Sequence, residues 1–237
     1  MSTVDVAPAA PPIGVLGGMG PLASAEFLKT IYEASLDRPE QQTPSVVLHS
    51  DPSMPDRTTA FLNGGTPLVL ARFIRSLEAL DAEGVSRIVV CCVTIHHLLP
   101  QLPPQLRGRI VSLIDVIADA VTATPERHLL LCTTGTRQLR LFERHEAWDR
   151  MRQHLLLPDD EDQARVHETI YRVKQFGDVP LLVRTVEELL AKYDARSFVA
   201  ACTEVHFAAK QINRAGASFR CIDPLQIIAA DMARGRL

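Results

Sequence analysis

The sequence predicts an α/β protein made of two similar half-domains, each a mostly parallel sheet flanked by helices, with the active site in the cleft between them. Short apolar runs alternate along the chain with stretches of helical hydrophobic periodicity, which is the pattern of successive β–α units. This succession of strands and helices occurs twice. In each half a buried strand runs into a cysteine, at Cys92 and Cys202, with a histidine four positions later.

The composition is that of an ordinary globular protein, with 46% hydrophobic and 22% charged residues among 237. A net charge of −3 and the lack of a basic block argue against nucleic acid as a partner. No apolar run approaches the roughly 18 residues of a membrane span, so no membrane partner is expected. Residues 1–12 do not resemble a secretory signal and are expected to form a disordered tail. Five cysteines in such a chain indicate reduced thiols and a cytoplasmic location.

The first half-domain is assigned to residues 13–114, with the C-terminal helix, 223–237, returning to it. A short strand from Ile13 runs into a glycine-rich turn. Its glycines do not fit G-x-G-x-x-G, so a small anion suits this turn better than a nucleotide cofactor. The further elements expected here are strands over 45–49, 88–90 and 110–113, helices over 22–35 and 66–83, and loops over 50–58 and around 100–104.

The second half-domain is assigned to residues 115–222. The apolar patterns predict strands from 128, over 153–157, before Cys202 and over 219–222. They predict helices over 115–122, through 139–148, over 163–176 and 179–193, to Asn213, and from Pro224. The acidic run 159–162 is expected to cap a helix, as are Asp115 and Asp223.

Two thiols that face one another have three uses: a disulfide, a metal site, or acid and base on opposite sides of one carbon atom. A metal site would need more soft ligands at short spacing, although His96 and His206 keep zinc as an alternative. Thiols exchange protons readily near neutral pH. Opposed acid–base chemistry therefore accounts best for two similar halves that each carry one cysteine.

Seven stretches along roughly 13–233 together resemble one known family, the aspartate/glutamate racemases, which are cofactor-independent amino-acid racemases. In chain order the stretches are Gly14-Val-Leu-Gly-Gly-Met-Gly-Pro-Leu22, Pro55-Asp-Arg-Thr58, Cys92-Val-Thr-Ile-His96, Thr133-Thr-Gly-Thr136, Ile170-Tyr-Arg-Val-Lys174, Cys202-Thr-Glu204 and Cys221-Ile-Asp-Pro224. Each stretch alone would be a weak signal, but seven in the right order are specific.

The resemblance implies an isomerase that needs neither pyridoxal phosphate nor a metal, with Cys92 and Cys202 as the catalytic acid and base. It implies substrate contacts from Met19, Arg57, Val93, Thr94, Thr136, Lys174 and Thr203, with His96 and Glu204 as auxiliary residues. Among these, Arg57 and Lys174 would hold the side-chain carboxylate of the substrate. The expected partner is a small amino acid or carboxylic acid, and a homodimer is consistent with the resemblance.

The sequence departs from the family pattern beside the first cysteine, where Val93 replaces the usual asparagine. Further departures are Cys91, Ile95 and Leu139. These changes leave a second hypothesis open, in which the fold carries out isomerisation, decarboxylation or a biosynthetic condensation or cyclisation on a carboxylic acid. A third hypothesis is a non-catalytic module that binds a small ligand. Cys91, Cys132 and Cys221 lie on apolar strands and are expected to be core thiols, and His97 and His206 are expected to be structural or at the surface.

Overall fold

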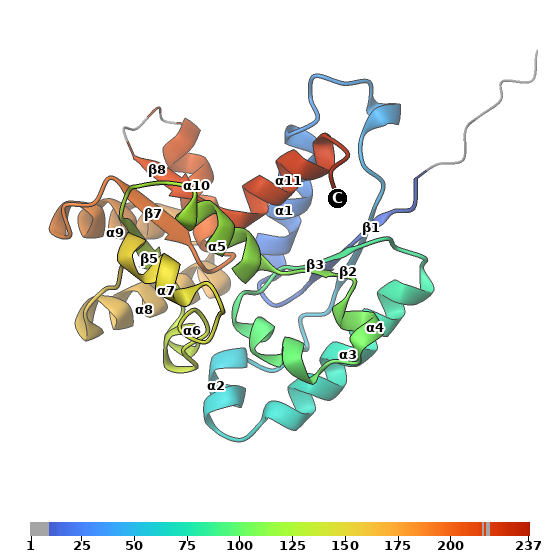
Figure 1. Ribbon diagram of the computed structural model, residues 1–237, viewed down its shortest axis with the longest axis horizontal. Coiled ribbons are helices and arrows are strands. Elements are labelled where there is room, and N and C mark those ends of the chain that lie inside the picture. The colour runs from blue at the N-terminus through green and yellow to red at the C-terminus, as the bar shows by residue number, and fades with distance from the viewer. Residues whose placement is uncertain (1–9, 215, 217–218) are drawn as a thin grey trace, which may run out of the picture.

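The computed structural model describes residues 10–214, 216 and 219–237, and in this part of the chain it contains two parallel sheets of four strands each. Figure 1 shows the two sheets in separate lobes, each with helices packed around it. The predicted fold class is therefore confirmed. Of the predicted disordered tail, residues 1–9 lie outside the described residues, and residues 10–12 have no regular secondary structure.

The first sheet has the strand order β2-β1-β3-β4. Its strands are β1 (Ile13–Gly17), β2 (Val46–Ser50), β3 (Ile88–Val90) and β4 (Ile110–Val111). All neighbouring strands are parallel, and β1 and β3 are fully buried because helices cover both faces of the sheet. The carboxyl ends of these strands therefore lie along one edge, where open α/β sheets place their ligands.

The second sheet repeats this topology, with the order β6-β5-β7-β8. Its strands are β5 (His128–Leu131), β6 (Leu155–Leu156), β7 (Ser197–Ala200) and β8 (Arg220–Ile222), again all parallel. The third strand of each half, β3 or β7, pairs with the first and fourth strands of its sheet. These two strands are the ones that precede Cys92 and Cys202.

Helices surround the sheet of the first half. They are α1 (Pro21–Glu33), α2 (Arg57–Leu62), α3 (Thr66–Ala82) and α4 (Pro104–Arg107), with the short 3₁₀ helices η1 (Glu40–Gln42) and η2 (Thr94–Gln101). In α3 the buried apolar residues recur at helical spacing, at Val69, Phe73, Leu77 and Leu80.

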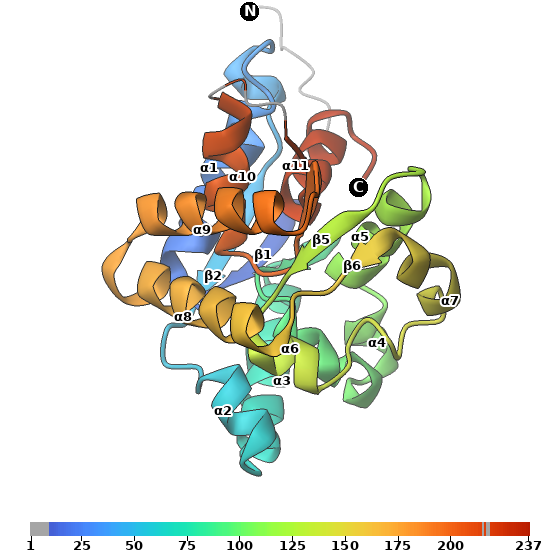
Figure 2. The ribbon, with the colours of Figure 1, turned by 90° about the vertical axis from the view of Figure 1, so that its left-hand side faces the viewer.

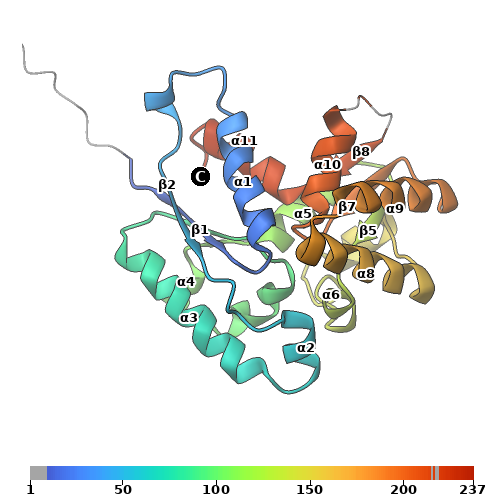
Figure 3. The ribbon, with the colours of Figure 1, turned by 180° about the vertical axis from the view of Figure 1, so that it is seen from behind.

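The remaining helices lie in the second half of the chain. They are α5 (Leu113–Thr122), α6 (Thr134–Gln138), α7 (Trp148–Met151), η3 (Arg152–His154), α8 (Asp160–Phe176), α9 (Val179–Lys192), α10 (Val205–Arg214) and α11 (Pro224–Ala233). Figure 2 shows α8 and α9 side by side on the second lobe. The C-terminal helix α11 packs against α1 of the first lobe, which is clearest from behind in Figure 3.

Several local predictions were wrong. No continuous helix runs through 139–148, because α6 ends at Gln138 and Arg140 adopts a left-handed φ of 53°, which a right-handed helix cannot continue. Only Leu155–Leu156 of the segment 153–157 is extended. The loop predicted around 100–104 is shorter than expected, since η2 ends at Gln101 and α4 begins at Pro104, which leaves only residues 102–103 between them.

The predicted helix caps had mixed outcomes. Asp115 is not a cap, because Ser112 caps α5 and accepts a hydrogen bond from the Asp115 backbone N–H. Asp223 caps α11, as predicted, and Asp159 at the start of the acidic run caps α8. In each confirmed case a side-chain oxygen satisfies an N–H group that the first helical turn leaves without a partner.

One cluster of buried apolar residues is shared by both sheets. It includes Val15 and Val89 from the first sheet, Leu130 and Val199 from the second, and residues of α1, α5 and α11. Two further clusters lie on the outer sides of the two sheets. In the described part of the chain, none of the helices combines the length and the apolar character needed to cross a membrane.

Candidate active site

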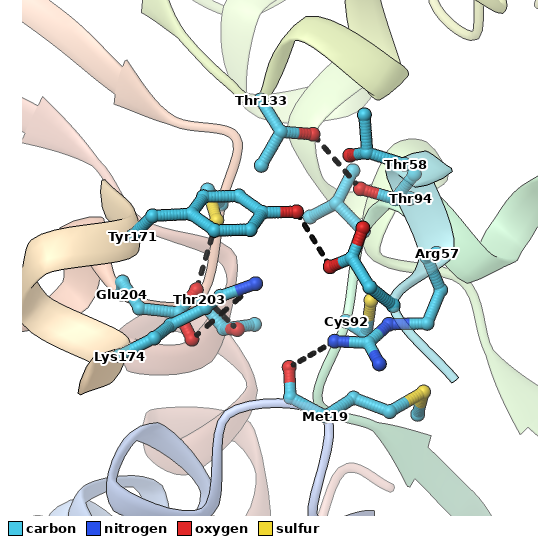
Figure 4. Close-up of a pocket in the computed structure, with 13 residues that line it drawn as sticks. Met19, Arg57, Thr58, Cys92, Thr94, Thr133, Tyr171, Lys174, Thr203 and Glu204 are labelled. Atoms are coloured by element: carbon cyan, nitrogen blue, oxygen red, sulfur yellow. Dashed lines mark hydrogen bonds and ion pairs between the residues drawn. The ribbon is translucent and has the colours of Figure 1, made fainter. Parts of the chain in front are cut away.

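A small cavity of about 10 Å³ lies between the two lobes, and both sheets contribute to its walls. Figure 4 shows its side chains converging from loops that follow the strands and from helix α8. We call it the thiol cavity. It is lined by Met19, Asp56, Arg57, Thr58, Cys92, Val93, Thr94, Thr133, Tyr171, Lys174, Cys202, Thr203 and Glu204.

Cys92 and Cys202 occupy equivalent points in the two sheets. Each is the second residue after its strand, since β3 ends at Val90 and β7 ends at Ala200. Both line the thiol cavity, and they are only 5% and 6% exposed. The repeated topology thus brings one thiol from each half to the same enclosed space.

Arg57 is the first residue of α2 and is only 7% exposed. Its terminal nitrogens donate hydrogen bonds to the backbone oxygens of Pro55 at 2.8 Å and of Met54 and Met19 at 3.2 Å. Its Nε is buried and has no hydrogen-bond partner among the described residues. The guanidinium is therefore held beside Cys92, with its Nε donor still available (Figure 4).

Lys174 reaches the cavity from the last turn of α8. Its Nζ lies 4.0 Å from Oε1 of Glu204 and 4.8 Å from the centre of the Tyr171 ring. Burial lowers the pKa of Lys174, but the Glu204 carboxylate and the charges of Cys202 and Cys92 together raise it more, so the net pKa lies above its ordinary value. The amino group is therefore charged, as a carboxylate-binding residue must be.

The threonine hydroxyls form a chain at one wall of the cavity. The Oγ1 atom of Thr94 lies 3.1 Å from that of Thr133 and 2.9 Å from that of Thr136. Thr136 does not line the cavity and lies behind Thr94. Across the cavity, the Thr203 hydroxyl donates to the backbone oxygen of Cys91 at 3.4 Å.

Val93 contributes an apolar patch to this otherwise polar cavity. It lines the thiol cavity and also belongs to the cluster of apolar residues that the two sheets share. Leu139, another departure from the family pattern, does not line the cavity and packs against the same cluster. Of these two departures, only Val93 lies where it can contact a ligand.

His96 lies behind Cys92 and not in the cavity wall. Its Nδ1 is 2.9 Å from the backbone oxygen of Cys92, and its Nε2 accepts from the backbone N–H of Leu113 at 3.0 Å. These partners require the tautomer with the proton on Nδ1. Burial lowers the pKa of His96 to about 4, so the ring is neutral and supports the backbone of Cys92.

The other predicted structural residues are placed as follows. Cys91 and Cys132 are buried in the apolar core, Cys221 is half-buried, and all five thiols are free. His206 is fully buried and bonded to Asp223, whereas His97 is half-buried. Within the described ranges, no group of three or more His, Cys, Asp or Glu side chains is arranged to hold a metal ion.

Four residues that line the cavity were missed from the sequence, namely Asp56, Thr58, Thr133 and Tyr171. All four lie within the family-like stretches 55–58, 133–136 and 170–174. Tyr171 precedes Lys174 by three positions in α8, a spacing that puts both side chains on one face of a helix. From this spacing, Tyr171 could have been predicted to line the cavity together with Lys174.

The model of the Asp/Glu/Hydantoin racemase family matches residues 16–232 of the chain. The chain belongs to this racemase family. As predicted, it is therefore related to racemases, which are isomerases. An uncharacterized protein from the pnlA 3′ region of Pectobacterium carotovorum subsp. carotovorum is 32% identical over 114 residues, which is 46% of this chain and 74% of that protein.

Solved structures of the racemase family share the fold. An aspartate racemase from Picrophilus torridus has a TM-score of 0.79 and 22% identity, covering 96% of this chain and 94% of that one. An aspartate racemase homologue from Pyrococcus horikoshii OT3 has a TM-score of 0.65 and 20% identity, covering 96% and 99%. The arrangement of two parallel sheets is thus that of aspartate racemase structures.

Proposed function

We propose that the chain is an amino-acid racemase, independent of pyridoxal phosphate, in which Cys92 and Cys202 act as base and acid. One observation carries the proposal: the two thiols reach the same enclosed cavity from equivalent points of two similar sheets. Inversion at Cα requires a proton acceptor on one face of the carbon and a donor on the other. Two groups related by a structural repeat meet that requirement.

In each turnover the thiolate of one cysteine removes the Cα proton and the thiol of the other delivers a proton to the opposite face. The first cysteine is then a thiol and the second a thiolate, which is the state needed for the reverse direction. The negative charge that develops on the substrate needs electrostatic stabilisation. Hydroxyls of Thr94, Thr133 and Thr203 line the cavity and are the donors suited to the α-carboxylate.

The cations of the cavity favour a substrate with a second carboxylate. Arg57 and Lys174 both line the cavity, and the Arg57 Nε lacks a partner among the described residues. A buried cation is costly unless an anion compensates it, and a side-chain carboxylate of the substrate would do so. The likeness to an aspartate racemase supports the same class of substrate, an acidic amino acid.

Val93 supports a second candidate function, other chemistry on a carboxylic acid. The apolar side chain offers no hydrogen bond, so a substrate that lacks a polar group at this point would fit the cavity better. Isomerisation, decarboxylation or a condensation could each use the same pair of thiols.

The decisive experiment follows Cα deuterium exchange and inversion for a panel of L- and D-amino acids in D₂O. We expect exchange with inversion for acidic amino acids, and its loss in both Cys92→Ala and Cys202→Ala. Cys132→Ala is the matched control, since this buried thiol lies outside the cavity and should retain activity. Turnover of a carboxylic acid without amino-acid exchange would favour the second candidate. Saturable binding without turnover would favour a non-catalytic module.

A further inference from the structure

The carboxylate of Glu204 is buried in direct contact with one of the two thiols. Glu204 is only 2% exposed. The Cys202 thiol donates a hydrogen bond to its Oε2 at 2.9 Å, and the Thr203 hydroxyl lies 3.4 Å from the same oxygen. A carboxylate at this distance favours the protonated thiol, because a thiolate would be repelled and would lose the bond.

The glycine turn after β1 fixes Glu204 from the other side. A Cβ atom at Gly20 would lie only 2.0 Å from Oε1 of Glu204, so the carboxylate fills the space that a side chain there would need. Gly20 also has a φ of 128°, which residues with a side chain rarely adopt. The turn and Glu204 thus determine each other's positions.

The charges around the two thiols differ although the sheets repeat. Cys202 faces the Glu204 carboxylate, with the Lys174 cation 4.0 Å beyond it. Cys92 faces the Arg57 guanidinium, and the residue two positions after it is the neutral Thr94 instead of an acid (Figure 4). A cation favours the thiolate and a carboxylate favours the thiol.

From this difference we infer that Glu204 is a positioning residue that keeps Cys202 protonated in the free enzyme, so that Cys92 is the thiolate at rest. The inference rests on the proposed two-base reaction and states which of the two cysteines is protonated in the free enzyme. It is consistent with burial and the Glu204 carboxylate, which together raise the pKa of Cys202 well above its ordinary value, while Lys174 opposes this shift only in part.

The test measures the ionisation of each thiol separately and needs no turnover. The full chain is alkylated with iodoacetamide between pH 6 and about 11, a range that extends above the ordinary pKa of a thiol, and labelling at each cysteine is followed by peptide mass spectrometry. The midpoint of each pH profile is compared rather than the absolute rate, because burial slows both reactions. In the wild type we expect Cys92 to reach its midpoint at a lower pH than Cys202.

The variant Glu204→Gln should lower the Cys202 midpoint by about one pH unit or more, a tenfold gain in thiolate at a fixed pH, and leave the Cys92 midpoint in place. Glu78→Gln, at an exposed position of α3, is the matched control and should shift neither midpoint. If Glu204→Gln fails to fold, Glu204→Asp carries the test, because its shorter side chain draws the carboxylate away and should give a smaller shift in the same direction.

A Cys202 midpoint at or below that of Cys92 in the wild type would overturn the inference. An unchanged Cys202 midpoint in folded Glu204→Gln would do the same. Failure of the proposed function would be seen in the deuterium-exchange experiment, as a lack of Cα exchange with every amino acid. The two failures are therefore distinguishable.

Discussion

The hydroxyl of Tyr171 donates a hydrogen bond of 2.5 Å to Oδ2 of Asp56, joining α8 of the second half to the start of α2 in the first. The other oxygen of Asp56 caps α2 by accepting from the backbone N–H of Thr59 at 2.8 Å. Burial and the bond to Asp56 raise the pKa of Tyr171 to about 12, so the hydroxyl remains a donor at neutral pH. Both residues line the thiol cavity, which this contact bridges.

Removing that hydroxyl should weaken substrate binding more than it weakens the chemistry. In Tyr171→Phe the α2 segment that carries Arg57 loses its tie to α8, and we expect kcat/KM to fall about tenfold, mostly through KM, which corresponds to roughly 1.4 kcal/mol. Steady-state kinetics in both directions measure this. Tyr193→Phe is the matched control, since that hydroxyl also donates to an aspartate, Asp162, but away from the cavity. Equal losses in both variants would contradict the prediction.

Restoring an amide beside Cys92 should show which substrate the cavity prefers. In Val93→Asn we expect the kcat/KM for an acidic amino acid to rise about tenfold, because the amide adds a hydrogen bond to a polar substrate. The same change should cost about 1–3 kcal/mol of stability, since Val93 also packs in the shared apolar cluster. Val93→Ala separates the loss of bulk from the gain of the amide. If kcat/KM for the acidic amino acid falls in Val93→Asn but not in Val93→Ala, the second candidate function is favoured.

Protonation of His96 should destabilise the fold in acid. Its pKa is about 4 in the folded protein against 6.5 ordinarily, so between these values the unfolded chain binds more protons and stability falls as the pH is lowered. The contribution is up to about 3 kcal/mol across that window. Urea unfolding at pH 7, 5.5 and 4.5 measures it. His96→Gln should flatten this pH dependence, whereas His97→Gln, at a half-buried position, should flatten it less.

The pair formed by His206 and Asp223 should matter for stability rather than for catalysis. The Nδ1 of His206 lies 2.5 Å from Oδ2 of Asp223, and its Nε2 lies 2.8 Å from the hydroxyl of Thr30 in α1, all in buried surroundings. His206→Ala should lower the free energy of unfolding by about 3–5 kcal/mol, because it leaves a buried carboxylate without its partner. His145→Ala, which breaks a bond to the exposed Asp115, should cost less than about 1 kcal/mol. Thermal melts that show similar losses for both variants would contradict this prediction.

The sequence was sufficient to predict the repeated topology, because parallel strands buried on both faces appear as continuous apolar runs such as 88–90. It was not sufficient around 139–148, where apolar residues at helical spacing belong to turns. The left-handed backbone of Arg140 ends the helix there, and no local pattern indicates it, since arginine has no preference for that conformation. Core packing around Leu141 and Phe142 produces the same periodicity without a helix.

For the site, the motifs predicted both thiols, Arg57 and Lys174 as lining residues, and the structure places all four in one cavity. The side-chain contacts between the two halves could not be predicted from the sequence. The bond between Tyr171 and Asp56 joins residues far apart in the chain, and neither side chain is unusual in its own segment. Similarly, the approach of the two cations to the thiols depends on how α2 and α8 pack, whereas Glu204 is already placed near Cys202 by its position in the chain.

The apolar cluster shared by the two sheets limits how a substrate can enter. Moving the lobes apart as rigid bodies would expose this cluster, at about 25 cal/mol for each Å² of apolar surface uncovered. Displacement of a short surface segment would expose less of it, and α2, whose first two residues line the cavity, is such a segment. We accordingly expect amide hydrogens in α2 to exchange faster than those in the central strands of both sheets.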